Sequence, residues 1–204
     1  MKSYLIKAEK EKKARTANIS SVLLENFKKN VLPLQINLEI GCGHGHWLTS
    51  FAQEQPNSLY VGIDLRTKRI DKAKSKARKK RLDNIMFMKA EAIEFIGALS
   101  DNFIVHNTYL MYPDPWPKAR HHKRRLFNDR FLELLLCVTT SDSKLYFKTD
   151  HQNYYHWSKD SVARNSNWNF CNSDWPHHQE SYFQKMLPDN YDFCIQKCIK
   201  DKDS

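Results

Sequence analysis

The sequence lacks any long apolar run. No stretch approaches the roughly 20 apolar residues that a membrane-spanning helix requires. The basic N-terminal stretch MKSYLIKAEKEKKAR also contains no apolar segment of the length found in a signal peptide. Both absences argue against a membrane protein and a secreted protein. We therefore expect a cytoplasmic protein that does not associate with membranes.

Cysteine is sparse and follows no regular spacing. The five cysteines are scattered, their number is odd, and no two of them form a CxxC pair. Disulfide scaffolds and zinc modules both depend on such spacings, so we expect reduced thiols and no metal site. His177 and His178 lie near Cys171, but the three residues do not have the spacing of a zinc site.

Negative charge is outnumbered by positive charge. Lys and Arg number 33 against 23 Asp and Glu, which gives a net charge of +10 and a pI near 9.3. This excess favours a polyanionic partner, although a basic protein without such a partner has the same composition. A length of 204 residues, 41 % of them hydrophobic, suits one globular domain. We expect that domain over residues 18–204. Residues 1–17 would form a basic arm, either mobile or the solvated end of a helix.

Apolar runs and helical stretches alternate from about residue 31 onward. Short apolar runs predict strands at 36–40, 59–64, 84–89, 103–112, 144–150 and 191–197. Apolar residues at helical spacing predict helices around 47–52, 70–77, 92–99, 130–138 and 154–164. This alternation predicts an α/β fold whose mostly parallel sheet carries helices on both faces. Ligands of such sheets bind beyond the carboxyl ends of the strands.

Acidic residues stand at or just after the ends of the first five predicted strands. They are Glu39, Asp64, Glu91, Asp114 and Asp150. Any one of them could be an ordinary helix cap or turn residue. Five in succession, in a chain that is basic elsewhere, instead indicate a cationic ligand at this edge.

A glycine-rich loop, GCGHG, follows the first predicted strand. Gly41, Gly43 and Gly45 allow a ligand to approach the backbone closely, but their spacing is GxGxG rather than the GxGxxG of dinucleotide-binding folds. Glu39 beside the loop would repel a pyrophosphate. S-adenosylmethionine carries a sulfonium and no phosphate, and Asp64 is placed to accept from its ribose hydroxyls. The pattern predicts a class I S-adenosylmethionine-dependent methyltransferase with a Rossmann-like fold, with an NAD-type oxidoreductase as the alternative.

Two segments of the chain are strongly basic and so carry charge opposite in sign to that of the acidic strand ends. Residues 66–81 hold ten basic residues and one acidic residue, and the segment 118–125 holds five more basic residues. Four of these five are expected to contact the phosphates of a polyanionic partner: Arg120, Lys123, Arg124 and Arg125. For 66–81 a merely solvated helix face is the alternative. The prolines at 113, 115 and 117 should hold Asp114 in a rigid, extended segment.

The segments LEIGCGHGHWL, GIDLRTKRI, PDPWPKARHHKRRL and FKTD occur in this order. Together they resemble the bacterial tRNA (guanine-N7-)methyltransferases from about residue 36 to 151. The resemblance implies methylation of guanine N7 in the variable loop of tRNA, with S-adenosylmethionine as cofactor. It further implies contacts of Glu39, Asp64, Glu91 and Asp114 with the cofactor or reaction centre. Lys118 and Asp150 would contact the substrate nucleoside.

The C-terminal part departs from that family's pattern. Ser181-Tyr182-Phe183-Gln184 is the nearest match to the family's Thr-x-Phe/Tyr-Glu substrate element. We therefore expect Ser181, Phe183 and Gln184 to contact the substrate. Compared with the family's element, Ser181 keeps a hydroxyl and Gln184 lacks the negative charge.

Guanine N7 has a free lone pair, so Asp114 is expected to act catalytically by stabilising charge rather than as a base. His121 and His122 are expected to be structural or phosphate-facing. An amino-group methyltransferase is disfavoured, because Asp-Pro-Trp replaces an (N/D)PP(Y/F) turn. A non-catalytic RNA-binding module is the alternative function, and monomer and homodimer both stay open.

Overall fold

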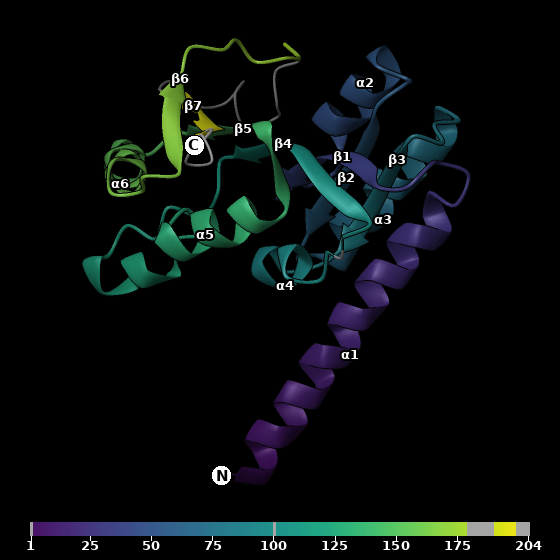
Figure 1. Ribbon diagram of the computed structural model, residues 1–204, viewed down its shortest axis with the longest axis horizontal. Coiled ribbons are helices and arrows are strands. Elements are labelled where there is room, and N and C mark those ends of the chain that lie inside the picture. The colour runs from purple at the N-terminus through teal and green to yellow at the C-terminus, as the bar shows by residue number, and fades with distance from the viewer. Residues whose placement is uncertain (1, 100, 179–189, 199–204) are drawn as a thin grey trace, which may run out of the picture.

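The computed structural model describes residues 2–99, 101–178 and 190–198. Seven strands form one sheet in the order β3-β2-β1-β4-β5-β7-β6 (Figure 1). The strands are β1 (Leu34–Ile40), β2 (Leu59–Asp64), β3 (Ile85–Lys89), β4 (Phe103–Met111), β5 (Thr139–Thr149), β6 (Trp168–Cys171) and β7 (Tyr191–Lys197). Neighbours among β1 to β5 are parallel, whereas β7 is antiparallel to β5 and β6. The predicted α/β fold with a mostly parallel sheet is confirmed.

Helices cover both faces of the sheet. They are α1 (Lys2–Asn26), α2 (His46–Glu54), α3 (Thr67–Lys79), α4 (Ala92–Ile96), α5 (Asp129–Cys137), α6 (Gln152–Ala163) and the 3-10 helix η1 (Ala119–Arg124). Buried side chains of α2 and α3 form one apolar layer with residues of the sheet, and those of α1, α4, α5 and α6 form a second, larger layer. The layers lie on opposite faces because side chains alternate along each strand. None of the helices in the described chain combines the length and apolar character of a membrane span.

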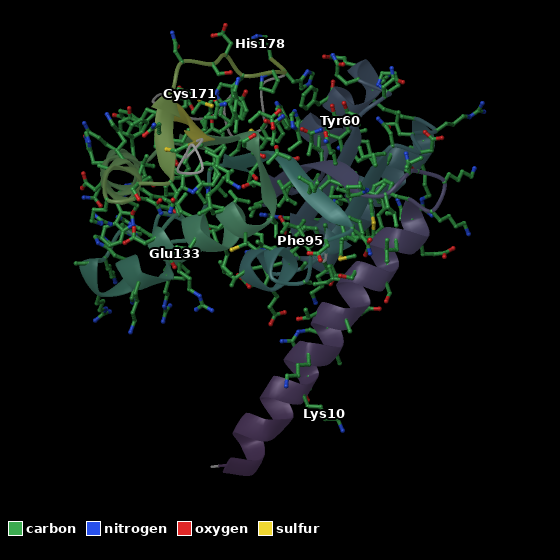
Figure 2. All side chains as sticks on the ribbon, in the orientation of Figure 1. Lys10, Tyr60, Phe95, Glu133, Cys171 and His178 are labelled. Atoms are coloured by element: carbon green, nitrogen blue, oxygen red, sulfur yellow. The ribbon has the colours of Figure 1, made fainter. Side chains whose placement is uncertain are left out.

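The N-terminal helix α1 docks along only part of its length. Ile19 and Leu23 are buried against the sheet, and Arg15 donates hydrogen bonds of 3.0 and 2.7 Å to the Glu94 carboxylate of α4. The preceding turns, which include Lys10, project from the body of the molecule (Figures 1 and 2). The mobility of residues 1–17 stays a prediction.

Strands β5 and β6 differ from the sequence-based prediction. Strand β5 begins at Thr139, before the predicted start at 144, because Thr139 pairs with Val105 ahead of an irregularity that leads to the pairing of Asn107 with Lys144. Strand β6 was not predicted: it has only four residues, and only Trp168 among them is fully buried. Because β7 runs antiparallel to β5, its first residue, Tyr191, lies opposite Thr149 at the carboxyl edge.

Candidate active site at the carboxyl edge of the sheet

The glycine loop after β1 is held in a left-handed conformation. Gly41, Gly43 and Gly45 have φ values of +78°, +55° and +65°, a region that disfavours other L-residues. A Cβ atom on Gly45 would lie 2.6 Å from the ring of Phe87, whereas one on Gly41 or Gly43 would meet no atom of the described residues within 4 Å. Gly45 is therefore needed for packing. Gly41 and Gly43 leave open space above the loop, which is the space a cofactor would need.

Asp64 connects the loop to strand β2. Its carboxylate accepts from the amide of Gly43 at 3.1 Å and from the amide of Arg66 at 2.8 Å, and the Arg69 guanidinium lies 3.5 Å away. The side chain is 6 % exposed, so these contacts are shielded from water. The carboxylate is thereby fixed beside the glycine loop, where the sequence predicted it.

Glu39 lies one residue before the end of β1 and is 5 % exposed. Its Oε2 atom is buried and makes no hydrogen bond within the part of the chain that the structure describes. Burial, together with the nearby charge of Asp64, raises the pKa of the Glu39 carboxyl from 4.5 to about 8. A buried acceptor without a donor is costly, and a cationic ligand or a donor group placed here would relieve that cost.

Glu91 occupies the N-cap position of α4. Its carboxylate accepts from the amide of Glu94 at 2.8 Å, which satisfies one of the free amides at the start of that helix. The structure therefore gives Glu91 a capping role. The predicted cofactor contact stays a prediction, because the half-buried side chain lies at the same edge as Asp64.

Asp114 is exposed and stands in a segment with an unusual backbone. Tyr112 and Trp116, on either side of it, have φ values of +50° and +44°, which are uncommon for residues with a side chain. The amide of Tyr112 donates to the carbonyl of Lys148 at 2.8 Å, which ties the segment to β5. Such a conformation persists only where surrounding contacts enforce it, and it is frequent at functional sites.

Arg125 supplies one of those enforcing contacts. It is 1 % exposed, and its Nε donates to the carbonyl of Pro115 at 2.9 Å, while its Nη2 donates to Asn153 at 2.7 Å. The guanidinium also lies over the rings of Tyr154 and Trp157, at 5.0 and 5.2 Å from their centroids. This burial does not fit the predicted contact with tRNA phosphate. The buried guanidinium instead clamps the proline segment onto α6.

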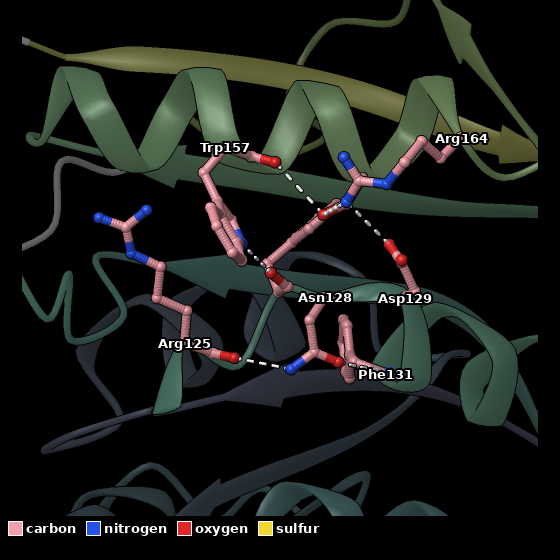
Figure 3. A network of polar contacts seen from close by, with 8 residues as sticks. Arg125, Asn128, Asp129, Phe131, Trp157 and Arg164 are labelled. Atoms are coloured by element: carbon pink, nitrogen blue, oxygen red, sulfur yellow. Dashed lines mark hydrogen bonds and ion pairs between the residues drawn. The ribbon is translucent and has the colours of Figure 1, made fainter. Parts of the chain in front are cut away.

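The segment that follows Arg125 is fixed by a small polar network (Figure 3). The Asn128 side chain accepts from the Phe131 amide at 3.0 Å as the N-cap of α5, and its amide group donates to the Arg125 carbonyl at 2.8 Å. Arg164, the C-cap residue of α6, reaches Asp129 at 3.3 Å. Helices α5 and α6 thus hold the end of the basic segment in place.

The other cations of 118–125 are exposed: Lys118, Arg120, Lys123 and Arg124. The Arg124 guanidinium lies 5.0 Å from the centroid of the half-buried Trp116 ring, and His121 contacts the same ring edge-on. His122 packs edge-on against Trp157. Both histidines thus pack against tryptophan rings, and their expected role, structural or phosphate-facing, stays a prediction.

Helix α3 presents a second basic surface beside the glycine loop. Only Ile70, Ala73 and Ala77 of this helix are buried, and its cationic side chains face outward. Burial and the charges of Lys72, Arg69 and Lys76 lower the pKa of His44 in the glycine loop. The positive field of α3 therefore reaches the mouth of the site.

Asp150 is exposed directly after β5, at the same edge as Asp114. Ser181, Phe183 and Gln184 lie outside the described residues. Lys148, Trp175 and Asp192 were not predicted to be functional residues, but in the structure they line a cavity of about 430 Å³ at this edge. The three lie far apart in the sequence, and they come together only in the folded structure. The described residues hold no cluster of His, Cys, Asp and Glu that could bind a metal ion.

The strand order and the glycine loop after β1 define the fold as that of a class I methyltransferase. TrmN from Thermus thermophilus, a solved structure, superposes with a TM-score of 0.58 at 16 % sequence identity, over 87 % of this chain and 48 % of that chain. A family model described as "Putative methyltransferase" matches residues 34–189.

The chain belongs to the tRNA (guanine-N(7)-)-methyltransferase family. A protein of that name from Lactobacillus helveticus is 32 % identical over 161 residues, which are 77 % of this chain and 72 % of the relative. Another from Syntrophotalea carbinolica is 38 % identical over 119 residues, 58 % of this chain and 51 % of the relative. The chain spans about half to two thirds of the length of the first relatives it matches.

Proposed function

We propose that this chain transfers a methyl group from S-adenosylmethionine to N7 of a guanine in the variable loop of tRNA. The observation that carries the proposal is the buried Glu39 carboxylate, with an oxygen that has no hydrogen-bond donor among the described residues, beside a glycine loop with open space above it. Family membership supports the reaction, and the basic surfaces support an RNA substrate. The proposal includes a cytoplasmic location and a methyltransferase domain over residues 18–204, preceded by the basic arm.

The cofactor would be held by residues with complementary charge and shape. Gly41 and Gly43 would offer backbone contacts, Glu39 and Asp64 would face the cationic and hydroxyl groups, and Glu91 would lie at the far end. When bound, S-adenosylmethionine supplies an electrophilic methyl group on a sulfonium. The acidic lining favours this cation over a dinucleotide, whose pyrophosphate it would repel.

The reaction at guanine needs no proton transfer to begin, because N7 carries a lone pair. Positive charge develops on the purine as the methyl group arrives, and an exposed, fixed carboxylate nearby stabilises that charge. Asp114 would act in this way, and Asp150 would assist from the neighbouring strand end. Lys118 would contact the same nucleoside, and Ser181, Phe183 and Gln184 would complete its pocket.

The phosphates of the RNA would lie on the basic surfaces. Arg120, Lys123 and Arg124 are exposed beside the Asp114 segment, and α3 extends the positive field to the other side of the glycine loop. The N7 edge of a guanine is hidden in the deep groove of an A-form helix. The target must therefore be in a loop or be turned out of its stack.

The direct test uses purified protein, unmodified tRNA and S-adenosylmethionine with a labelled methyl group. The label is expected on guanine N7, and a label on another base atom would contradict the assignment. Protein that binds tRNA but shows no affinity for S-adenosylmethionine would instead support the RNA-binding module.

A pair of variants tests the division of roles. Asp114→Asn should lower turnover and leave tRNA affinity nearly unchanged, because the residue faces the reaction centre. The double variant Lys123→Ala, Arg124→Ala should weaken tRNA binding and reduce its dependence on salt. If both variants lost binding alone, this division would be wrong.

A further inference from the structure

A cavity of about 430 Å³ lies between the first turn of α2 and strands β5 and β7, on the sheet face that carries α2. Its walls include Trp47 from the first turn of α2, Met111 at the end of β4, and Lys148, Trp175, His178 and Asp192. These residues stand at the carboxyl edge, where the candidate site also lies. The volume is large enough for a nucleobase, and the walls combine aromatic rings with charged groups.

The charged pair in this cavity is set by the register of the sheet. Lys148 of β5 and Asp192 of β7 are directly opposite each other, and their Nζ and Oδ2 atoms are 3.4 Å apart. Opposite residues of antiparallel strands have side chains on the same face, so the ammonium and the carboxylate stand side by side. Lys148 is 9 % exposed, an uncommon degree of burial for lysine.

Trp175 fixes the orientation of that pair. Its indole nitrogen donates to Asp192 Oδ2 at 3.2 Å, and the Lys148 ammonium lies 4.5 Å from the centroid of its ring. The ring in turn packs on Tyr146 and meets Trp47 edge-on, with centroids 5.4 and 6.3 Å away. A donor, an acceptor and aromatic surfaces are thus held together in one half-enclosed space.

We propose that this cavity receives the target guanine and that Lys148 and Asp192 read its Watson–Crick edge, an inference that rests on the proposed function. That edge presents the O6 acceptor beside the N1 and N2 donors. A carboxylate accepts from the two N–H groups, and an ammonium donates to O6. The aromatic walls would contact the face of the base.

The same arrangement discriminates against other bases. Adenine presents an N6 donor and an N1 acceptor on this edge, so the carboxylate would face a lone pair at N1. Inosine keeps O6 and N1–H but lacks the N2 amino group. Reading the Watson–Crick edge also leaves N7 uncovered on the opposite side of the base. The backbone link from Lys148 to Tyr112 connects this cavity to the segment that carries Asp114.

The test compares synthetic tRNAs that carry guanine or inosine at the target position. The wild-type protein should methylate guanine with a kcat/KM about 10- to 100-fold higher, as expected for one lost hydrogen bond to a charged group. Asp192→Asn should reduce this preference to about threefold or less, because the acceptor for the amino group loses its charge. Asp160→Asn makes the same change in charge at an exposed residue of α6 that does not line the cavity, and it should keep the wild-type preference.

The affinity for S-adenosylmethionine and the preference for guanine over inosine together separate the possible results. Affinity for S-adenosylmethionine should be the same in wild type and Asp192→Asn, since the pair faces the base. The inference is overturned if Asp192→Asn lowers kcat/KM for the guanine tRNA and the inosine tRNA in equal proportion. It is also overturned if wild type shows no preference for guanine over inosine. Wild-type protein that methylates no guanine N7 would refute the proposed function itself.

A second variant keeps the test decisive if Asp192→Asn melts below the assay temperature. Lys148→Met removes the donor to O6 and can be compared on guanine and 6-thioguanine, which keeps the N1 and N2 donors but replaces O6 with a weaker acceptor. Wild type should prefer guanine, and Lys148→Met should lose that preference. An unchanged preference in Lys148→Met would overturn the inference as well.

Discussion

The adjacent arginines at positions 124 and 125 should differ in how much stability the protein loses when each is replaced by glutamine. Arg125→Gln removes two hydrogen bonds, of 2.9 and 2.7 Å, from a charged donor, together with its contacts to two aromatic rings. Hydrogen bonds to charged groups contribute about 1.5–3 kcal/mol each, and the burial of the charge offsets part of that gain. We expect a loss of about 3 kcal/mol in the free energy of unfolding.

Urea unfolding followed by tryptophan fluorescence measures this loss directly. For a domain of this size about 3 kcal/mol corresponds to a fall in Tm of about 6–12 °C. Arg124→Gln is the matched control, because Arg124 is exposed. Its stability should change by less than about 0.5 kcal/mol, while the salt dependence of tRNA binding should fall by about one phosphate contact. If Arg125→Gln kept wild-type stability and weakened tRNA binding as Arg124→Gln does, the clamp would be refuted.

Four further substitutions test the glycine loop and other buried positions. Gly45→Ala should cost about 3 kcal/mol of stability, because its Cβ would lie 2.6 Å from Phe87 at a left-handed φ. Gly43→Ala should cost only about 1 kcal/mol, and denaturant titration compares the two. The raised pKa of Glu39 means that its contribution to stability is fully present below about pH 4.5 and declines as the pH rises to about 8. Unfolding of ligand-free Glu39→Gln should lack this decline. Asn84→Ala should lower Tm, with a loss of about 2–3 kcal/mol, because the buried amide donates to three backbone carbonyls.

Much of the fold could be predicted because the parallel strands are buried on both faces. Strand β2 has the predicted bounds, 59–64, since its six residues form one apolar run that ends at Asp64. Strand β6 could not be predicted: it is a short strand at the edge of the sheet, and its residues Asn169 and Phe170 are exposed. The acidic strand ends were predictable because parallel strands place their carboxyl ends at one edge.

The roles of individual side chains at the site depended on contacts that the sequence does not encode locally. Arg124 and Arg125 are adjacent and chemically identical, yet only the second meets α6, so burial alone separates their roles. Lys148 and Asp192 become neighbours only through the pairing of β5 with β7. No spacing rule relates two residues so far apart in the chain.

The strained segment around Asp114 also has a consequence for the entropy of binding. Proline at 113, 115 and 117, together with the left-handed residues Tyr112 and Trp116, leaves the backbone few alternative conformations. A flexible segment would lose about 1–2 kcal/mol of conformational free energy per residue when RNA orders it. In this segment the loss of conformational entropy occurs when the protein folds, so it does not reduce the free energy of RNA binding. Affinity for RNA and stability of the fold are therefore linked, and a substitution that loosens the Arg125 clamp should weaken binding without touching the RNA.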